Sequence, residues 1–422
     1  MSELVRKPDE VRGLSDLAFD ELRRGMGGIA AIHGAVAGRA FGAVGAMGLP
    51  ARVAHDAVSS GVYAGLRGAA AFMGRAAGAV LATREVGDGR PLSTSPRGSA
   101  VLGALNGLLG DTLEREGSDL NMPMSVRVAG QVVPANEEAL AEVFPDGAPR
   151  LVVFLHGLME TEHAWRLGAG PGGETYASRL ARDLGCTAIH VRYNTGRHIS
   201  ENGRSLDELL EEVCDSWPVP VEEIDLVGHS MGGLVARSAC HYGSEGGSQW
   251  VRHVSHVVSL GTPHLGAPLA QAVHVADAAL HAVPEVRPFG SVLRRRSAGI
   301  RDLRHGSLVD EDWHGRDPHS LRKEAMTEVP LLDGATHCFV AATITASPRH
   351  PLGRLVGDAL VLEPSASGRG RDRRIPFRAE HGMHVGRTHH LALLNHPVVY
   401  ERLLEWLSAE PARRTPEPAG AS

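Results

Sequence analysis

The stretch Gly228-His229-Ser230-Met231-Gly232 is the part of the chain whose residue types and spacing could do chemistry. Its serine stands between glycines two residues before and two residues after it, which leaves room for a sharp strand-to-helix turn. The mostly apolar residues 224–227 are typical of a buried strand, and residues 234–236 continue as a helix. On such a turn the serine hydroxyl stands clear of the sheet as a nucleophile. The N–H of Met231, at the start of the helix, would face a developing oxyanion.

A serine hydroxyl is a poor nucleophile at neutral pH, so a histidine must take its proton and a carboxylate must fix the imidazole tautomer. We expect Asp358, in a loop after the predicted strand 338–345, to be the acid. We expect His390, which precedes an amphipathic helix over residues 398–407, to be the base. The alternatives are Asp372 and Glu363 for the acid, and His389, His384 and His396 for the base.

The strongest alternative base is His389, because it is the immediate neighbour of His390. Only one of two adjacent side chains can face the serine. The Leu-x-Leu-Leu spacing that follows favours His390.

A second oxyanion donor is expected on the turn His156-Gly157-Leu158-Met159. The continuous apolar run of residues 151–155 before it is typical of a strand buried on both faces. Next to a serine turn of this kind such a loop lies beside the serine, and by position the donor is the backbone N–H of Leu158. The loop needs backbone groups there, so we expect His156 to shape the loop and not to act as a base.

The composition predicts one large catalytic domain with an appendage, because 422 residues exceed an average domain. Hydrophobic residues make up 43% of the chain and charged residues 22%, the balance of an ordinary soluble protein with an ample core. A net charge of −6 at pH 7 argues against a nucleic-acid partner. Residues 1–24 have no apolar signal-peptide core, so we expect a cytoplasmic location.

Strand, helix and strand alternate through the catalytic region, which predicts a mostly parallel sheet wrapped by helices on both faces. An antiparallel hairpin is expected over residues 124–133. The expected parallel strands are residues 151–155, 187–191, 224–227, 256–260 and 338–345, and the expected helices are residues 101–110, 174–183, 206–217 and 234 onward.

Residues 1–99 form a segment of their own, in which residues 25–84 are dominated by Gly and Ala. The uncharged runs fall short of the ~20 apolar residues that a bilayer span needs. We expect a helical appendage packed on the catalytic domain or on another subunit, because so much glycine makes a poor free-standing helix. The alternative is a peripheral membrane or lipid-surface contact through residues 25–84. A linker rich in Gly, Pro and Ser follows at residues 86–99.

Residues 100–409 then form the catalytic domain, with an insertion at residues 267–332 that is far longer than a usual crossover. We expect this insertion to be helical over residues 269–283. A lid or cap over the serine and simple structural filler are both open for it. Residues 410–422 are predicted to be a disordered tail.

No cofactor and no metal site are predicted. His381-x-x-His384 could suggest metal ligation, but no HExxH motif or cysteine partner accompanies it, so a solvated loop is expected. The cysteines form no CxxC pair and we expect buried reduced thiols. They are Cys186, Cys214, Cys240 and Cys338. We predict no particular oligomeric state.

Together the motifs resemble those of bacterial α/β-hydrolase-fold lipases and esterases, and within them the group that includes the GPI-inositol-deacylase-like hydrolases. The resemblance covers residues 150–407 and follows the chain order serine, acid, histidine. It rests on the stretches at residues 155–158, 228–233, 261–266, 357–361 and 390–397. One departure is Ala359, where many relatives have glycine. The resemblance also implies Asp358 as the acid and His390 as the base.

The expected function is therefore cleavage of carboxylic esters, of a small molecule or a lipid, through an acyl-enzyme on Ser230. A thioesterase or an acyltransferase on the same triad is the alternative among enzymes, since these residues specify acyl chemistry and not the acceptor. An alternative from another class is a membrane- or partner-binding protein with a vestigial hydrolase domain, against which the complete set of triad residues argues.

Overall fold

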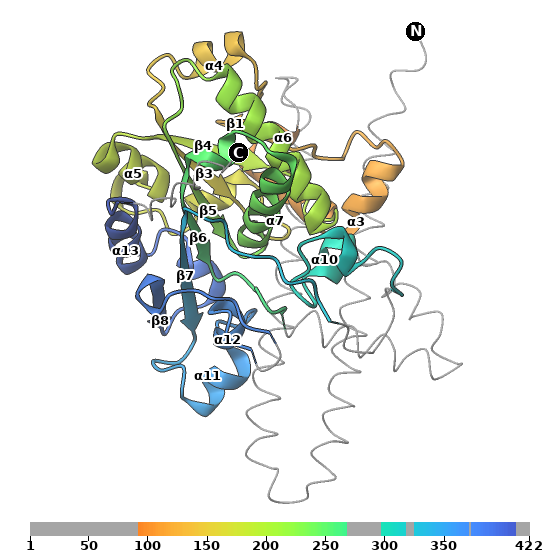
Figure 1. The fold of residues 1–422 in the computed structure, drawn as a ribbon, viewed down its shortest axis with the longest axis vertical. Coiled ribbons are helices and arrows are strands. Elements are labelled where there is room, and N and C mark those ends of the chain that lie inside the picture. The colour runs from red at the N-terminus through yellow and green to blue at the C-terminus, as the bar shows by residue number, and fades with distance from the viewer. Residues whose placement is uncertain (1–91, 268–296, 318–324, 371–372, 411–422) are drawn as a thin grey trace, which may run out of the picture. The chain divides into compact units, whose positions relative to one another are not determined.

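The computed structural model describes residues 92–267, 297–317, 325–370 and 373–410 (Figure 1). The chain divides into two compact units. The first comprises Met1–Leu102, Leu269–Arg296 and His319–Arg322, of which residues 92–102 are described. The second comprises Gly103–Pro268, Ser297–Pro318 and Lys323–Ser422, and it holds the sheet.

Eight strands form one sheet in the order β2-β1-β4-β3-β5-β6-β7-β8. The β1–β2 and β1–β4 pairs are antiparallel, and all pairs from β4 to β8 are parallel. The strands are β1 (Ser125–Val128), β2 (Gln131–Val133), β3 (Arg150–Leu155), β4 (Thr187–Arg192), β5 (Glu223–His229), β6 (Val254–Leu260), β7 (Thr336–Thr343) and β8 (Gly382–Gly386). The predicted α/β-hydrolase type of sheet, mostly parallel with an antiparallel hairpin at one edge, is confirmed.

Nine α-helices are described in these parts of the chain: α3 (Pro96–Arg115), α4 (Glu137–Val143), α5 (Tyr176–Leu184), α6 (Ile199–Ser216), α7 (Met231–Gly246), α10 (Ala298–Asp302), α11 (Pro351–Val356), α12 (Glu363–Ala366) and α13 (Pro397–Leu407). Short 3-10 turns join them, among them η4 (Glu162–Arg166), η6 (Trp250–His253), η8 (Asp310–Asp312) and η10 (His390–Leu393). Helices α5 and α13 lie on one side of the strands and α6 and α7 on the other (Figure 1).

The core follows from the alternation of side chains along strands that are buried on both faces. One apolar layer joins alternate residues of the central strands, such as Phe154, Val227 and Val340, to α5 and α13. The intervening residues of β3, β5 and β6 face α7, which packs on these strands and on α6. The cysteines Cys186, Cys240 and Cys338 are buried thiols, and Cys214 is a half-buried one. The expectation of unpaired cysteines is confirmed.

Several elements differ from the sequence-based expectation, and α4, α11 and α12 were not expected at all. Helix α6 begins at Ile199 and not at 206, because Glu201 caps its first turn by accepting from the N–H of His198. Helix α3 begins at Pro96, so the expected linker ends before it, and Ser95 caps this start by accepting from the N–H of Gly98. Strand β8 lies where a solvated loop around residues 381–384 was expected.

Several expectations concern residues outside the described ranges: the Ala/Gly-rich segment of residues 25–84, the helix over residues 269–283 and the tail of residues 411–422. Within the described residues, no helix is both long enough and apolar enough to cross a membrane. The described part of the insertion, residues 297–317, packs closely, and Leu308, Val309 and Asp312 are buried.

One buried ion pair ties the loop after β3 to the end of β4. The guanidinium of Arg192 donates from Nε to Glu162 Oε2 at 2.5 Å and from Nη2 to the other carboxylate oxygen. Arg192 is fully buried and Glu162 is nearly so. Burial raises the pKa of Glu162, but the hydrogen bonds and charge of Arg192 outweigh it and lower that pKa overall.

Arg192→Met should therefore lower the free energy of unfolding by about 3–5 kcal/mol, because it leaves a buried carboxylate without its partner. Urea denaturation followed by tryptophan fluorescence measures the change. Replacing both partners, as Arg192→Met with Glu162→Leu, should restore much of the stability. Arg182→Met, which removes an exposed partner of Glu174, is the control and should leave the midpoint near wild type. Equal losses in the two single variants would contradict the assignment.

Candidate active site

Ser230 lies between the last residue of β5 and the first residue of α7, in a backbone conformation (φ 53°, ψ −119°) that side chains rarely adopt. Its N–H donates to the carbonyl of Leu260 at 2.8 Å, which fixes the turn against β6. A Cβ at Gly228 would come within 2.4 Å of Gly233 N, and one at Gly232 within 2.3 Å of Leu155 O. Both flanking glycines are therefore needed for this turn to pack.

Asp358 and His390 are brought together from two loops that are distant in the sequence. Asp358 Oδ2 lies 2.7 Å from His390 Nδ1. A backbone hydrogen bond joins the same two residues, because His390 N donates to Asp358 O at 2.9 Å. The other carboxylate oxygen, Oδ1, accepts from Val361 N at 2.8 Å and from Leu360 N at 3.0 Å. Both side chains are nearly fully buried. The carboxylate is thus fixed in orientation before it meets the imidazole.

The turn that carries the acid is tight on both sides of Asp358. Gly357 has a φ of 62° and Ala359 a φ of 89°, both in the region that favours glycine. A Cβ at Gly357 would come within 1.9 Å of Val361 O. Ala359 therefore adopts a backbone conformation that glycine adopts more readily.

Within the pair, the attraction between carboxylate and imidazole outweighs the effect of burial on both pKa values. Burial raises the pKa of Asp358, but the facing imidazole and the backbone hydrogen bonds outweigh it, so the pKa lies below its usual range. Burial lowers the pKa of His390, but the Asp358 carboxylate outweighs it, so this pKa lies above its usual value. The carboxylate therefore stays ionised and stabilises a proton on the imidazole.

Ser230 and His390 both lie against the Leu260–Gly261 segment. Ser230 is hydrogen-bonded to Leu260, and a Cβ at Gly261 would come within 3.1 Å of His390 Cε1 and Nδ1. Among the described residues no hydrogen bond joins the serine hydroxyl to the imidazole. The structure thus pairs acid with base and puts the serine in their neighbourhood, and such contacts often tighten only when substrate binds.

The loop after β3 lies against the serine turn, since a Cβ at Gly157 would come within 3.0 Å of Ser230 Cβ. Three of its N–H groups have acceptors: Gly157 donates to Glu160 Oε2, Met159 to Thr195 Oγ1, and Glu160 to Gly157 O. No acceptor among the described residues faces the N–H of Leu158. Met231, at the first position of α7, likewise has no intrahelical acceptor for its N–H.

His156 is fully buried and stacks on Tyr193 at 4.4 Å. Its Nδ1 donates to Gly157 O at 3.0 Å and its Nε2 accepts from Tyr193 N at 3.3 Å. Burial is the main cause that lowers its pKa to about 4. This side chain shapes the loop, as its position in the sequence suggests.

The alternative acids and bases have other surroundings. His389 is exposed, and His384 lies on β8 with Nε2 2.9 Å from Thr343 Oγ1, so its expected solvated-loop position is wrong. His396 is the residue before α13, and Glu363 is the first residue of α12. Asp372 lies outside the described residues.

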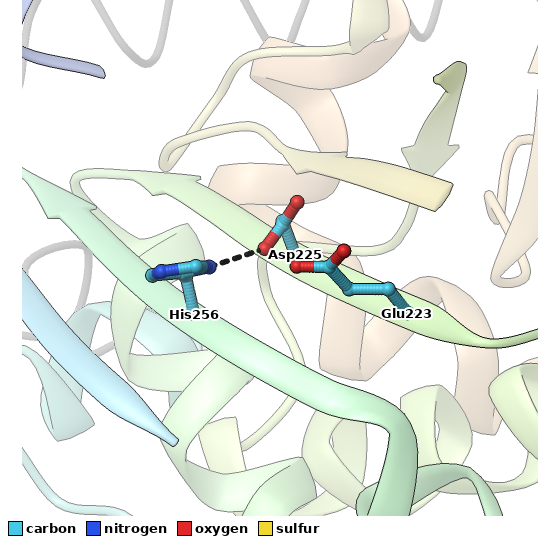
Figure 2. A group of neighbouring side chains, drawn as sticks. All are labelled: Glu223, Asp225 and His256. Atoms are coloured by element: carbon cyan, nitrogen blue, oxygen red, sulfur yellow. Dashed lines mark hydrogen bonds and ion pairs between the residues drawn. The ribbon is translucent and has the colours of Figure 1, made fainter. Parts of the chain in front are cut away.

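Within the described residues, one group has the composition of a metal site: Glu223, Asp225 and His256, whose candidate ligand atoms lie within 4.8 Å of one another (Figure 2). Register explains the cluster, because Asp225 pairs with His256 across β5 and β6, and Glu223 is two residues away on the same face. Sequence reasoning missed this cluster, because residues on different strands give no local spacing signal.

Arg150 provides the positive charge in this cluster. Its Nη2 lies 2.7 Å from Asp225 Oδ2 and 3.3 Å from Glu223 Oε1, and His256 Nδ1 lies 2.7 Å from Asp225 Oδ1. Asp225 and His256 are fully buried at the start of their strands, at the end of the sheet away from Ser230. The arrangement is an ion-pair network joining β3, β5 and β6, in which a protein cation already occupies the carboxylates.

Residues 146–315 match the family model of the PGAP1-like alpha/beta domain. The match includes Ser230 and the loop of residues 156–160, and it ends before Asp358 and His390. It confirms the resemblance that the motifs indicate. A comparison with curated proteins gave no match.

Similar solved structures include lipases and esterases. The lipase BlEst2 of Bacillus licheniformis in its mature form is 20% identical, over 60% of this chain and 91% of that chain, with a TM-score of 0.39. The esterase of Pyrobaculum calidifontis is 14% identical, over 61% of this chain and 71% of that chain, with a TM-score of 0.32. A laboratory-evolved potato epoxide hydrolase is 11% identical, over 62% and 93% of the two chains, with a TM-score of 0.35.

Proposed function

We propose that this chain is a serine hydrolase that cleaves carboxylic esters of small molecules or lipids through an acyl-enzyme on Ser230. The observation that carries the proposal is the buried pair of Asp358 and His390, 2.7 Å apart, beside a serine on a strained strand-to-helix turn. That set of groups, in that chain order, is what acyl transfer by a serine needs.

In the proposed reaction His390 removes the proton from Ser230 Oγ as the oxygen attacks the ester carbonyl. The tetrahedral oxyanion accepts from the N–H groups of Leu158 and Met231. Collapse of this intermediate expels the alcohol, which takes the proton from His390. Water, activated by the same imidazole, then releases the acid and restores the serine. Asp358 keeps the imidazole in the required tautomer throughout.

The test of the nucleophile is a fluorophosphonate probe, which phosphonylates an activated serine with loss of fluoride. We expect labelling of Ser230 in the tryptic peptide that spans residues 205–237, read by fragmentation in the mass spectrometer. The denatured chain is the control and should not be labelled. Labelling at another serine, or none in the folded chain, would contradict the proposal.

The acceptor and the acyl group are tested with substrates. A chain-length series of nitrophenyl esters measures the preferred acyl length. An acyl thioester measures thioesterase activity, and product analysis with an added alcohol separates transfer from hydrolysis. If a thioester is cleaved much faster than an ester, the protein is a thioesterase that uses the same catalytic residues.

The pH dependence follows from the base. Since His390 must be neutral to accept the proton, kcat/KM should fall as the pH drops through its raised pKa, with a midpoint above the ordinary value of 6.5. Asp358→Asn removes the charge that raises this pKa. The acidic side of the kcat/KM profile, its acid limb, should therefore move to lower pH while kcat drops. Glu363→Gln is the matched control and should leave the limb in place. An acid limb unaffected by Asp358→Asn would contradict the role of Asp358.

We propose the same division of the chain as the sequence suggests: an appendage and linker over residues 1–99, a catalytic domain over residues 100–409 with a lid or cap at residues 267–332, and a tail over residues 410–422. Contact of residues 25–84 with a lipid surface is the alternative to a packed appendage. Co-sedimentation of the full chain with vesicles, lost on deletion of residues 1–99 while short-ester activity persists, would establish the lipid contact.

A further inference from the structure

The side chain of Glu160 folds back onto its own loop and reaches the residue before the serine. Its Oε2 accepts from Gly157 N at 2.6 Å and lies 3.0 Å from Nδ1 of His229. His229 is fully buried at the end of β5, and Glu160 is 14% exposed. One carboxylate oxygen therefore joins the loop after β3 to the strand that carries Ser230.

This connection continues to the base. The imidazole of His229 has its Nε2 3.4 Å from the carbonyl oxygen of His390, and the two rings lie 4.8 Å apart. A Cβ at Gly157 would be 3.0 Å from both Glu160 Oε2 and Ser230 Cβ, so the carboxylate and the serine border the same small space. The Glu160–His229 pair thus touches the loop with the oxyanion donor, the strand with the nucleophile and the segment with the base.

The loop that Glu160 folds onto is also fixed from outside. Tyr193 donates from its hydroxyl to His156 O at 2.5 Å, and Thr195 Oγ1 accepts from Met159 N at 3.1 Å. A Cβ at Gly107 of α3 would come within 2.4 Å of Met159 Cγ, so the helix backbone lies directly against Met159. Glu160 is thus the tether at the residue before Leu158, and Thr195 is the tether at the residue after it.

The geometry points to a positioning role for Glu160 and His229: they hold the N–H of Leu158 on the oxyanion, and the charge of Glu160 stabilises the protonated form of His390. This inference rests on the proposed function, because Leu158 and His390 are donor and base only in that reaction. Neither Glu160 nor His229 touches the reacting atoms in it. Both act through their neighbours.

The charge of Glu160 is consistent with this role. Burial raises the pKa of Glu160, but His229 and the N–H of Gly157 outweigh it, so the carboxylate is ionised. After burial and Asp358, the charge of Glu160 is a further cause acting on the pKa of His390, and it raises that pKa. His390 is therefore bonded to Asp358 and lies against the ring of His229, and Glu160, which is paired with that ring, acts on His390 through its charge.

Two substitutions at one position separate the hydrogen bonds from the charge. Glu160→Asp keeps the charge but is one methylene shorter, so it cannot hold both Gly157 N and His229 Nδ1. We expect kcat on a soluble nitrophenyl ester to fall roughly 10- to 100-fold with KM and the acid limb near wild type. Glu160→Gln keeps an oxygen for Gly157 N but loses the charge. We expect a smaller loss of kcat and an acid limb of kcat/KM moved to lower pH.

The matched control is Glu142→Gln, an exposed carboxylate on α4, which should match wild type in rate and pH profile. Wild-type kcat and an unmoved acid limb in both Glu160 variants, with Ser230→Ala inactive, would overturn the inference and leave the proposed function standing. Activity retained by Ser230→Ala would instead overturn the proposed function itself.

Circular dichroism shows whether the Glu160 variants fold. If they do not, His229→Gln takes their place, because it removes the imidazole that joins Glu160 to the segment of His390. In a folded His229→Gln variant, a loss of kcat at unchanged KM supports the inference. A wild-type kcat and an unmoved acid limb in that variant overturn it.

Discussion

Ser230→Ala should abolish ester hydrolysis while the protein keeps its fold. Loss of the nucleophile from a working triad typically costs ~10^4-fold or more in kcat, because no neighbouring group can form the acyl-enzyme. The side chain is half-buried on a turn and lies outside the apolar layer that α5 and α13 cover. The backbone bond from Ser230 N to Leu260 O does not depend on the hydroxyl, so the turn should persist.

Initial rates on a soluble nitrophenyl ester measure this effect, and circular dichroism with a thermal melt verifies the fold. Ser244→Ala, an exposed serine on the same helix α7, is the matched control and should keep the wild-type rate. A folded Ser230→Ala variant that hydrolyses at more than about a tenth of the wild-type rate would exclude Ser230 as the nucleophile.

The central part of the fold could be predicted because its signals are local. Strands buried on both faces read as continuous apolar runs, as residues 151–155 do, and the serine turn places its glycines at fixed spacing. Strand β8 carried no such signal: two of its five residues are glycines and its burial is partial. It exists because β7 offers it a hydrogen-bonding edge, which is a long-range cause.

The active site also has contacts that the sequence predicts and contacts that it does not. The pairing of Asp358 with His390 could be expected because chain order and loop position limit the choices. The contact between Glu160 and His229 could not be expected from the sequence. Glu160 lies in the loop after β3 and His229 at the end of β5, and no fixed spacing in the sequence relates the two. The same holds for the network of Arg150, Asp225 and His256, which depends on strand register. Polar contacts across a sheet become visible only when the register is known.

The two neighbouring histidines give the second large effect that we expect. His390→Ala should be as damaging as the serine substitution, at ~10^4-fold in kcat, because the imidazole that takes the proton is lost. His389→Ala should keep most of the activity, since His389 is exposed while His390 is nearly fully buried on Asp358.

The rates of the two alanine variants can be compared because the loop should keep its conformation in both. The main-chain bond from His390 N to Asp358 O, at 2.9 Å, remains in an alanine variant. Labelling by the fluorophosphonate probe should slow sharply in His390→Ala and stay near wild type in His389→Ala, since it requires the same activated hydroxyl. If the two variants gave reversed results, the base would be His389, and the hydrogen bond between His390 and Asp358 would be structural.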